Sequence, residues 1–100
     1  MTLSEIASDI KAMEEKLRNY ERKYGLRSPQ FFELYRAGRL RDEEPTEVRD
    51  FGDWAACYDI KIDREQRYDE LIRQRLAKIG SATVSMRDIL PERHAVSGIA

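Results

Sequence analysis

The sequence predicts an all-α protein: a long helix, a short aromatic helix, an acidic loop, a second long helix and a semi-ordered C-terminal tail. Three observations indicate this fold class. Apolar residues recur at intervals of three and four, and glycines and prolines separate the periodic segments. The hydrophobic and charged fractions, 41% and 37%, suit amphipathic helices with solvated faces. We expect a helical bundle domain over residues 1–80 and a tail or partner-binding arm over residues 81–100.

The first predicted helix carries a regular apolar seam. Thr2 and Glu5 form a capping-box pattern at its start, and Gly25 suits the left-handed conformation that ends a helix. Between them, apolar side chains alternate in spacings of three and four, as in a coiled coil. The seam consists of Leu3, Ile6, Ile10, Met13, Leu17, Tyr20 and Tyr24. It fits either an internal face of a bundle or a contact with a second chain.

The second predicted helix is short and rich in aromatic residues. Ser28 is a good N-cap, Pro29 suits the first helical position, and Gly38 suits the end. Residues 38–50 then form the predicted loop, because Pro45 prevents a helix from continuing through it. The loop contains the acidic run Asp42, Glu43 and Glu44, which fits either a solvated loop or a partner-binding surface.

The third predicted helix starts at Asp50, with Asp53 in a capping-box-like position, and ends at Gly80. Its weak point lies at residues 60–65, where β-branched and Asp residues lower helix propensity, and this composition fits either a continuous helix or one with a kink or short break there. Its last apolar positions extend the predicted seam. They are Ile72, Leu76 and Ile79. Together with the first helix, they predict a coiled-coil-like homodimer.

The tail differs in composition from the helices. The stretch "ATVSM" fits a short strand by alternation, and "MRDIL" fits a helical turn that Pro91 stops. The apolar side chains of this tail are Val84, Met86, Ile89 and Leu90. They fit an arm that docks on a partner, or one that packs on its own bundle or dimer mate.

Composition argues against several functions. Lys and Arg number 18 and Asp and Glu number 19, so the chain lacks the basic excess of most nucleic-acid binders. The single cysteine, Cys57, and the single histidine, His94, cannot make a zinc site alone. No glycine-rich phosphate loop is present, and no carboxylate stands in an apolar frame. We expect no catalysis, no cofactor, no metal and no small-molecule substrate.

The location of the protein follows from its Cys content and its N-terminus. A lone cysteine cannot form an internal disulfide, which fits a reducing compartment. The N-terminus is acidic and amphipathic, unlike a signal peptide, and no apolar run approaches the ~20 residues that span a bilayer. We expect a cytoplasmic protein that does not bind membranes.

The turn at residues 25–28 also fits a helix-turn-helix. In that motif the second helix would place Gln30 toward the bases, and basic side chains would contact phosphates. The candidates for DNA contact are Arg27, Gln30, Arg36 and Arg39. Against this interpretation, Phe31 and Phe32 suit a core, and Glu33 opposes the arginines. A corner in a helical bundle is therefore the favoured interpretation, and a DNA-binding regulator is the alternative.

Residues 20–60 resemble small prokaryotic helical proteins, the antitoxin-like partners of type II toxin–antitoxin pairs. In those proteins a long helix ends in a Lys-Tyr-Gly turn. An aromatic helix ending in Gly and an acidic stretch follow, and an Asp-Phe-x-Asp/Glu-Trp segment opens the last helix. The matching residues are Lys23, Tyr24, Gly25, Ser28, Phe32, Gly38, Asp50, Phe51, Trp54 and Tyr58.

The resemblance implies a non-enzymatic protein that neutralises a cognate toxin, often a ribonuclease, and helps to repress its own operon through operator DNA. A protein that binds phosphate groups offers a basic surface, so acidic side chains would complement it. We expect Asp42, Glu43 and Glu44 to contact the toxin and the apolar tail to wrap it. A helix-turn-helix regulator and a structural or adaptor subunit of a larger assembly remain the alternatives.

Overall fold

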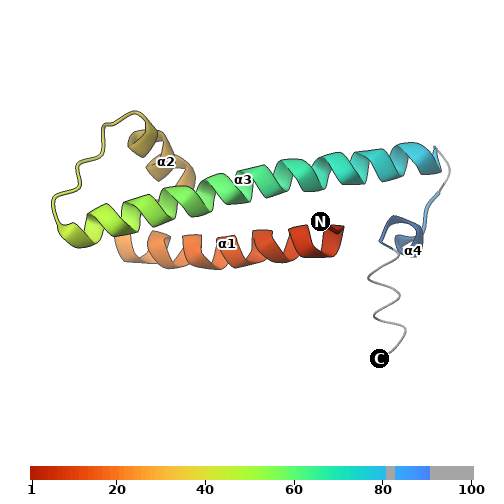
Figure 1. Cartoon of the computed structure of the whole chain (residues 1–100), viewed down its shortest axis with the longest axis horizontal. Coiled ribbons are helices and arrows are strands. Elements are labelled where there is room, and N and C mark those ends of the chain that lie inside the picture. Colours follow the sequence, from red (N-terminus) through yellow and green to blue (C-terminus); the bar gives the residue numbers. More distant parts are fainter. Residues whose placement is uncertain (81–82, 91–100) are drawn as a thin grey trace, which may run out of the picture.

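A computed structural model of the chain describes residues 1–80 and 83–90, which form four helices and no strand. They are α1 (Leu3–Tyr24), α2 (Ser28–Arg36), α3 (Pro45–Ile79) and α4 (Met86–Ile89). The predicted all-α fold class is confirmed. α1 and α3 lie side by side and antiparallel, α2 packs on the first half of α3, and α4 lies near its far end (Figure 1).

The ends of α1 are fixed by local contacts, as predicted. The Thr2 hydroxyl accepts a hydrogen bond from the Glu5 backbone N–H at 3.1 Å, and the Glu5 carboxylate accepts one from the Thr2 N–H. These bonds satisfy amides that would otherwise lack partners at a helix start. At the other end, Gly25 adopts a φ of 74°, a region that favours glycine.

The start of α2 differs from the prediction. Ser28 is the first residue of the helix rather than its N-cap, and Arg27 stands at the capping position without a side-chain bond. The Glu21 carboxylate from α1 takes over the capping role, because the Ser28 backbone N–H donates to it at 2.8 Å. The end of α2 is as predicted, with Gly38 at a φ of 67°.

The start of α3 also differs from the prediction. Pro45 does not block the helix but begins it, because proline lacks only an N–H that is unpaired at a helix start anyway. The Glu47 carboxylate accepts hydrogen bonds from the backbone N–H groups of Glu43 and Glu44. The helix therefore starts five residues earlier than the expected start at Asp50.

No break interrupts α3 at residues 60–65, and α3 runs as one helix of 35 residues. Ion pairs one turn apart span the weak stretch. Lys61 pairs with Glu65, and Arg67 pairs with Asp63. Such pairs support a helix by a few tenths of a kcal/mol each, so they offset part of the low helix propensity of this stretch.

The end of α3 and the segment after it are partly as predicted. Gly80 ends the helix at a φ of 89°, and its N–H donates to the Leu76 carbonyl. Residues 83–85 form no strand, in contrast to the prediction for "ATVSM". Ser85 instead caps the single turn of α4, whose position at "MRDI" agrees with the sequence.

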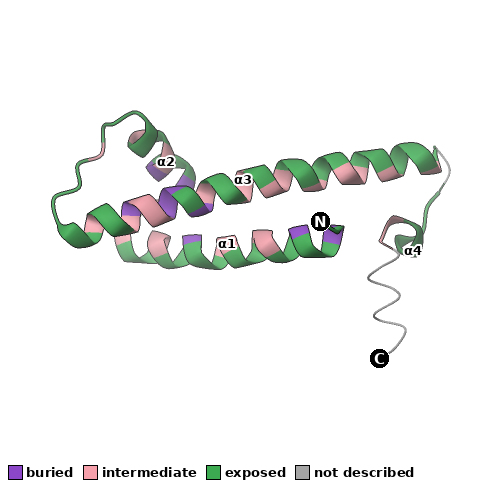
Figure 2. Ribbon diagram, in the orientation of Figure 1, coloured by how far each residue is buried: buried purple, intermediate pink, exposed green. Residues whose placement is uncertain are grey.

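The main core lies where α1, α2 and the first half of α3 meet (Figure 2). Its buried residues are Leu17, Phe31, Phe51, Trp54, Ala55 and Cys57. Leu3 and Ile6 are also buried, near the start of α1. Between these two regions the apolar side chains are only half-buried, so the core is concentrated at one end of the molecule.

Candidate partner-binding surfaces

Aromatic rings fix the junction of α1, α2 and α3. The Phe31 ring stacks on the Trp54 indole with centroids 3.8 Å apart and an angle of 2° between the planes. Tyr20 and Tyr24 of α1 lie on the same indole, each 5.7 Å away. Stacked rings add stability beyond the apolar area they bury. α2 is therefore held on α3 by the side chain of Phe31, as a corner in a bundle would be.

A buried polar network crosses the same junction. The Trp54 indole N–H donates to the Ser28 hydroxyl at 2.9 Å, and that hydroxyl donates to the Glu21 carboxylate at 2.7 Å. Burial alone would raise the pKa of Glu21, but the hydrogen bonds from Ser28 and the nearby Arg27 lower it overall. The network thus links one residue from each of the three helices and favours an ionised Glu21.

Two carboxylates of α3 tie the helix to α1. Asp50 accepts hydrogen bonds from Lys23 and Tyr24, the second at 2.6 Å, and Asp53 accepts one from Tyr20. The hydrogen bond from Lys23, followed by that from Tyr24, lowers the pKa of Asp50. The two residues therefore join helices, and neither caps α3, in contrast to the capping role that the sequence suggested.

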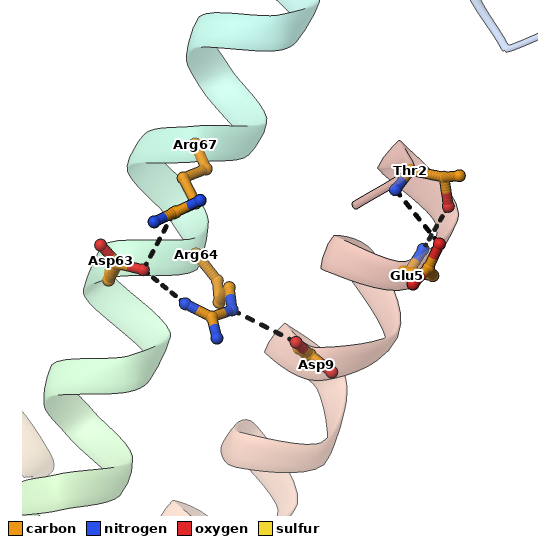
Figure 3. A network of polar contacts seen from close by, with 6 residues as sticks. All are labelled: Thr2, Glu5, Asp9, Asp63, Arg64 and Arg67. Carbon is orange, nitrogen blue, oxygen red and sulfur yellow. Dashed lines mark hydrogen bonds and ion pairs between the residues drawn. The ribbon is translucent and has the colours of Figure 1, made fainter.

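A further polar network sets the register of α1 on α3 (Figure 3). The Arg64 guanidinium pairs with Asp9 of α1 at 3.2 Å and with Asp63 of its own helix, and Arg67 also pairs with Asp63. Exposed ion pairs contribute less than about 1 kcal/mol each. Their role here is positional, since the arginine spans the gap between helices where buried side chains are few.

The predicted acidic run lies in the link that leads into α3. Asp42, Glu43 and Glu44 are exposed, and within the described residues none of them forms an ion pair with Lys or Arg. The backbone of this run is fixed by the bonds to Glu47, so the three carboxylates project from an ordered segment. Nearby, Val48 is 54% exposed and lies on the first turn of α3.

Residues 83–90 of the predicted arm lie at the opposite end of the molecule from the acidic run (Figure 1), and residues 81–82 and 91–100 of the arm lie outside the described residues. Met86 is 58% exposed and Val84 is 38% exposed, whereas Ile89 and Leu90 are half-buried. The Arg75 guanidinium donates to the Ile89 carbonyl and so attaches α4 to α3. The longest dimension of the molecule is 54 Å, and the two predicted partner-binding sets are not brought together.

The seam residues of α1 face α3 of the same chain. Leu3, Ile6 and Leu17 are buried there, and the others are half-buried: Ile10, Met13, Tyr20 and Tyr24. The buried side chains of Leu3, Ile6 and Leu17 are thus shielded from water without a second chain. The seam residues of α3 are more open. Ile72 and Ile79 are half-buried and Leu76 is 39% exposed, in the part of the helix that runs past the start of α1.

The candidate DNA-contacting residues lie on the outside of the corner. Arg27, Gln30, Arg36 and Arg39 are all exposed. The Arg36 guanidinium also stands 5.6 Å from the centre of the Phe32 ring, a cation–π contact. Because Phe31 occupies the core side of α2, Gln30 is left on the solvent side of the same helix.

The hollows of the described surface are open grooves. One of about 480 Å³ lies between the start of α1, Tyr68 and Leu90, and one of about 320 Å³ lies between α1, Pro29 and Tyr58. Cys57 is buried and its thiol pKa is raised by that burial, which disfavours a reactive thiolate. His94 lies outside the described residues.

The described residues contain neither a candidate metal-ion cluster nor a candidate membrane-spanning helix. In residues 1–80 and 83–90, His, Cys, Asp and Glu side chains form no group of three that could hold a metal ion. In the same part of the chain, no helix combines the length and the apolar character that crossing a membrane requires.

Comparisons with known proteins found no counterpart for this chain. No protein-family model, no curated protein and no solved structure matches it. Several of the motif residues between positions 20 and 60 build the junction of α1, α2 and α3. Lys23, Tyr24, Phe51 and Trp54 all make contacts between helices there.

Proposed function

We propose that the protein is a non-enzymatic, antitoxin-like interaction protein that binds and neutralises a cognate toxin and helps to autoregulate its operon. One observation carries the proposal: the exposed carboxylates of Asp42, Glu43 and Glu44 project from an ordered segment and have no cationic partner in the described structure. Carboxylates in this state complement the basic surface of a protein that binds phosphate groups, such as a ribonuclease.

The toxin would also contact the apolar arm. Val84 and Met86 are exposed, and Ile89 and Leu90 are only half-buried. An incoming partner can therefore cover all four side chains while breaking few contacts within the chain. Because the acidic run and the arm lie at opposite ends of α3, one toxin molecule must either extend along the helix or bind one end at a time. We favour the acidic run as the first contact, since charge complementarity mainly raises the association rate.

The test begins with affinity capture of the tagged chain from its native host. The proposal expects a stoichiometric small basic protein that is toxic when expressed alone and harmless when expressed with this chain. Reversal of the acidic run, Asp42→Lys with Glu43→Lys and Glu44→Lys, should slow association with that protein in a salt-dependent way, with the largest effect at low salt. Unchanged rates at all salt concentrations would show that the acidic run is only a solvated loop.

The alternative is a regulator that binds operator DNA through the turn between α1 and α2. The exposure of Arg27 and Gln30 on the solvent side of that turn favours it. A specific DNA footprint that is lost in Arg27→Ala and Gln30→Ala would establish the regulator. A structural or adaptor subunit of a larger assembly would instead be identified by its captured neighbours.

The coiled-coil-like homodimer is a separate proposal. Burial of Leu3, Ile6 and Leu17 against α3 weighs against α1 as its interface. The exposed side chain of Leu76 leaves the end of α3 as the part of the seam that another copy can reach.

A further inference from the structure

The last two turns of α3 and the segment that follows them form a distinct surface. Leu71 lines a groove together with Met1 and Ile6 at the start of α1, so residues 72–79 run about 12 Å past that start. We define the α4 end as residues 72–79 and 83–90. Leu76, Val84 and Met86 are its exposed apolar side chains, at 39%, 38% and 58%.

The α4 end is basic. Its charged residues are Arg73, Arg75, Lys78, Arg87 and Asp88, which sum to a net charge of +3 in a chain whose net charge is −1. Arg73 also pairs with Glu70 in the preceding turn, which leaves an excess of two positive charges when that carboxylate is included. Two copies of this end would therefore repel each other if they met in a symmetric contact. The occupant that complements this surface must carry exposed carboxylates beside an apolar side chain.

The other end of the same molecule has this chemistry. Residues 42–48, which we call the acidic segment, contain four carboxylates and no Lys or Arg, a net charge of −4, although Arg41 and Arg49 flank them. The exposed Val48 closes the segment. Its backbone is held at the start of α3 by the Glu47 carboxylate, so it is already ordered before any partner arrives.

A chain cannot bring its own two ends together. The acidic segment includes the first turn of α3, and the α4 end includes its last two turns. α3 is a single helix of 35 residues (Figure 1), and positions 48 and 72 lie about 36 Å apart along it. We propose that the α4 end of one copy binds the acidic segment of a second copy, in a head-to-tail contact. Because each bound copy leaves one basic and one acidic end open, the contact continues into chains of molecules or closed rings.

This inference concerns the chain alone and does not depend on the proposed toxin. The two ideas nevertheless interact, because a toxin that takes Asp42, Glu43 and Glu44 would compete with the next copy for the same carboxylates. Self-association is measured on the purified protein without any toxin, so the failure of one idea is distinguishable from the failure of the other.

The experiment is sedimentation analysis of three proteins over a range of concentrations. They are the natural chain, an acidic-segment variant with Asp42→Lys, Glu43→Lys and Glu44→Lys, and an α4-end variant with Arg73→Glu, Lys78→Glu and Arg87→Glu. The natural chain should form species that grow with concentration. Its association should weaken on the order of tenfold when salt rises from about 50 to about 500 mM.

The two variants together identify the geometry of the contact. Each variant alone carries charge of one sign at both ends, so each should remain monomeric. Mixed in equal amounts they should associate, because the natural acidic segment of one then meets the natural α4 end of the other. A control with charge reversals on exposed positions of α1 outside both ends, Arg18→Glu with Arg22→Glu, should associate like the natural chain. Circular dichroism establishes that all four proteins are folded.

Three results would overturn the proposal. The first is a natural chain that is monomeric at every concentration and salt. The second is association that persists in either variant alone, since that indicates a symmetric contact through the unaltered end. The third is a folded mixture of the two variants that stays monomeric while the natural chain associates.

Discussion

At the scale of single residues, Ser28 connects the three helices of the junction. Its hydroxyl accepts from the Trp54 indole and donates to Glu21, and its backbone N–H also donates to Glu21. Ser28 is only 2% exposed, so no bulk water replaces it as a partner of the indole. The residue that looked like a local helix cap is thus a long-range connector, with both of its side-chain partners outside α2.

Replacement of Ser28 by alanine should leave the Trp54 N–H buried without an acceptor. We expect Ser28→Ala to lower the free energy of unfolding by about 1–3 kcal/mol, the usual cost of an unpaired buried donor. Urea denaturation followed by circular dichroism measures the change. Ser4→Ala, on an exposed position of α1, is the matched control and should change stability by less than about 0.5 kcal/mol. Equal stability of the two variants would contradict the role of the network.

Glu21 should make stability depend on pH. The pKa of Glu21 is lower in the folded chain than its ordinary value, so the folded state binds fewer protons than the unfolded state. The stabilisation is therefore complete above the ordinary pKa and is lost as pH falls through the lowered one. Glu21→Gln should cost about 1 kcal/mol at pH 7, and the difference from the natural chain should shrink between about pH 5 and pH 3. A difference that stays constant with pH would assign the effect to packing.

At the scale of helices, sequence predicts the helix ends and lengths that depend on neighbouring residues, but it does not predict the contacts between residues far apart in the chain. The capping box at Thr2, the end of α1 at Gly25 and the short length of α2 all follow from residues within one turn. The start of α3 differs from the prediction because proline either blocks or begins a helix, and no local pattern indicates that Glu47 holds the turn before Pro45.

The candidate partner-binding surfaces also have some features that local sequence predicts and others that only long-range contacts determine. The exposure of the acidic run and of Met86 follows from polarity and position. The links from Glu21 to Ser28, from Asp50 to Lys23 and from Arg64 to Asp9 join positions that no periodicity relates. The one available signal is that Asp50 and Asp53 share a helix face with Trp54, while the first helix carries two tyrosines on its apolar seam.

Two glycines test how far backbone conformation governs the helix ends. Gly25 has a φ of 74°, so Gly25→Ala is strained although no atom lies within 4 Å of the added Cβ, and we expect it to cost about 1 kcal/mol. Gly52 lies inside α3 with equally open space, so Gly52→Ala should stabilise the chain by about 0.5–1 kcal/mol. Thermal unfolding of the two variants should give shifts of opposite sign, and shifts of the same sign would refute the argument.

At the scale of the whole molecule, the core is at one end and the exposed apolar and charged groups extend to the other. The first half of α3 contributes Phe51, Trp54, Ala55 and Cys57 to the core, and its second half contributes no fully buried residue. Small helical domains of about 100 residues have slim stability margins. The second half of α3 is thus the part whose stability a partner or a second copy can most increase.

The predicted seam dimer has a direct test at this scale. Ile10 is half-buried between α1 and α3. If α1 is an internal face, Ile10→Asp should destabilise the folded chain by about 2–4 kcal/mol without changing the oligomeric state of what remains folded. If α1 is a dimer seam, the variant should be monomeric while the natural chain is a dimer. Light scattering and urea denaturation on the same samples distinguish the two results.

The stacking of Phe31 on Trp54 has a practical consequence. Trp54 is the only tryptophan of the chain, so its near-ultraviolet fluorescence reports on one place, the contact between α2 and α3. Detachment of α2 would expose the indole and shift its emission to longer wavelength. A ligand that docks near α4, at the far end of the molecule, should leave the spectrum unchanged. The intrinsic fluorescence of Trp54 therefore distinguishes a change at the contact between α2 and α3 from binding at the far end of α3.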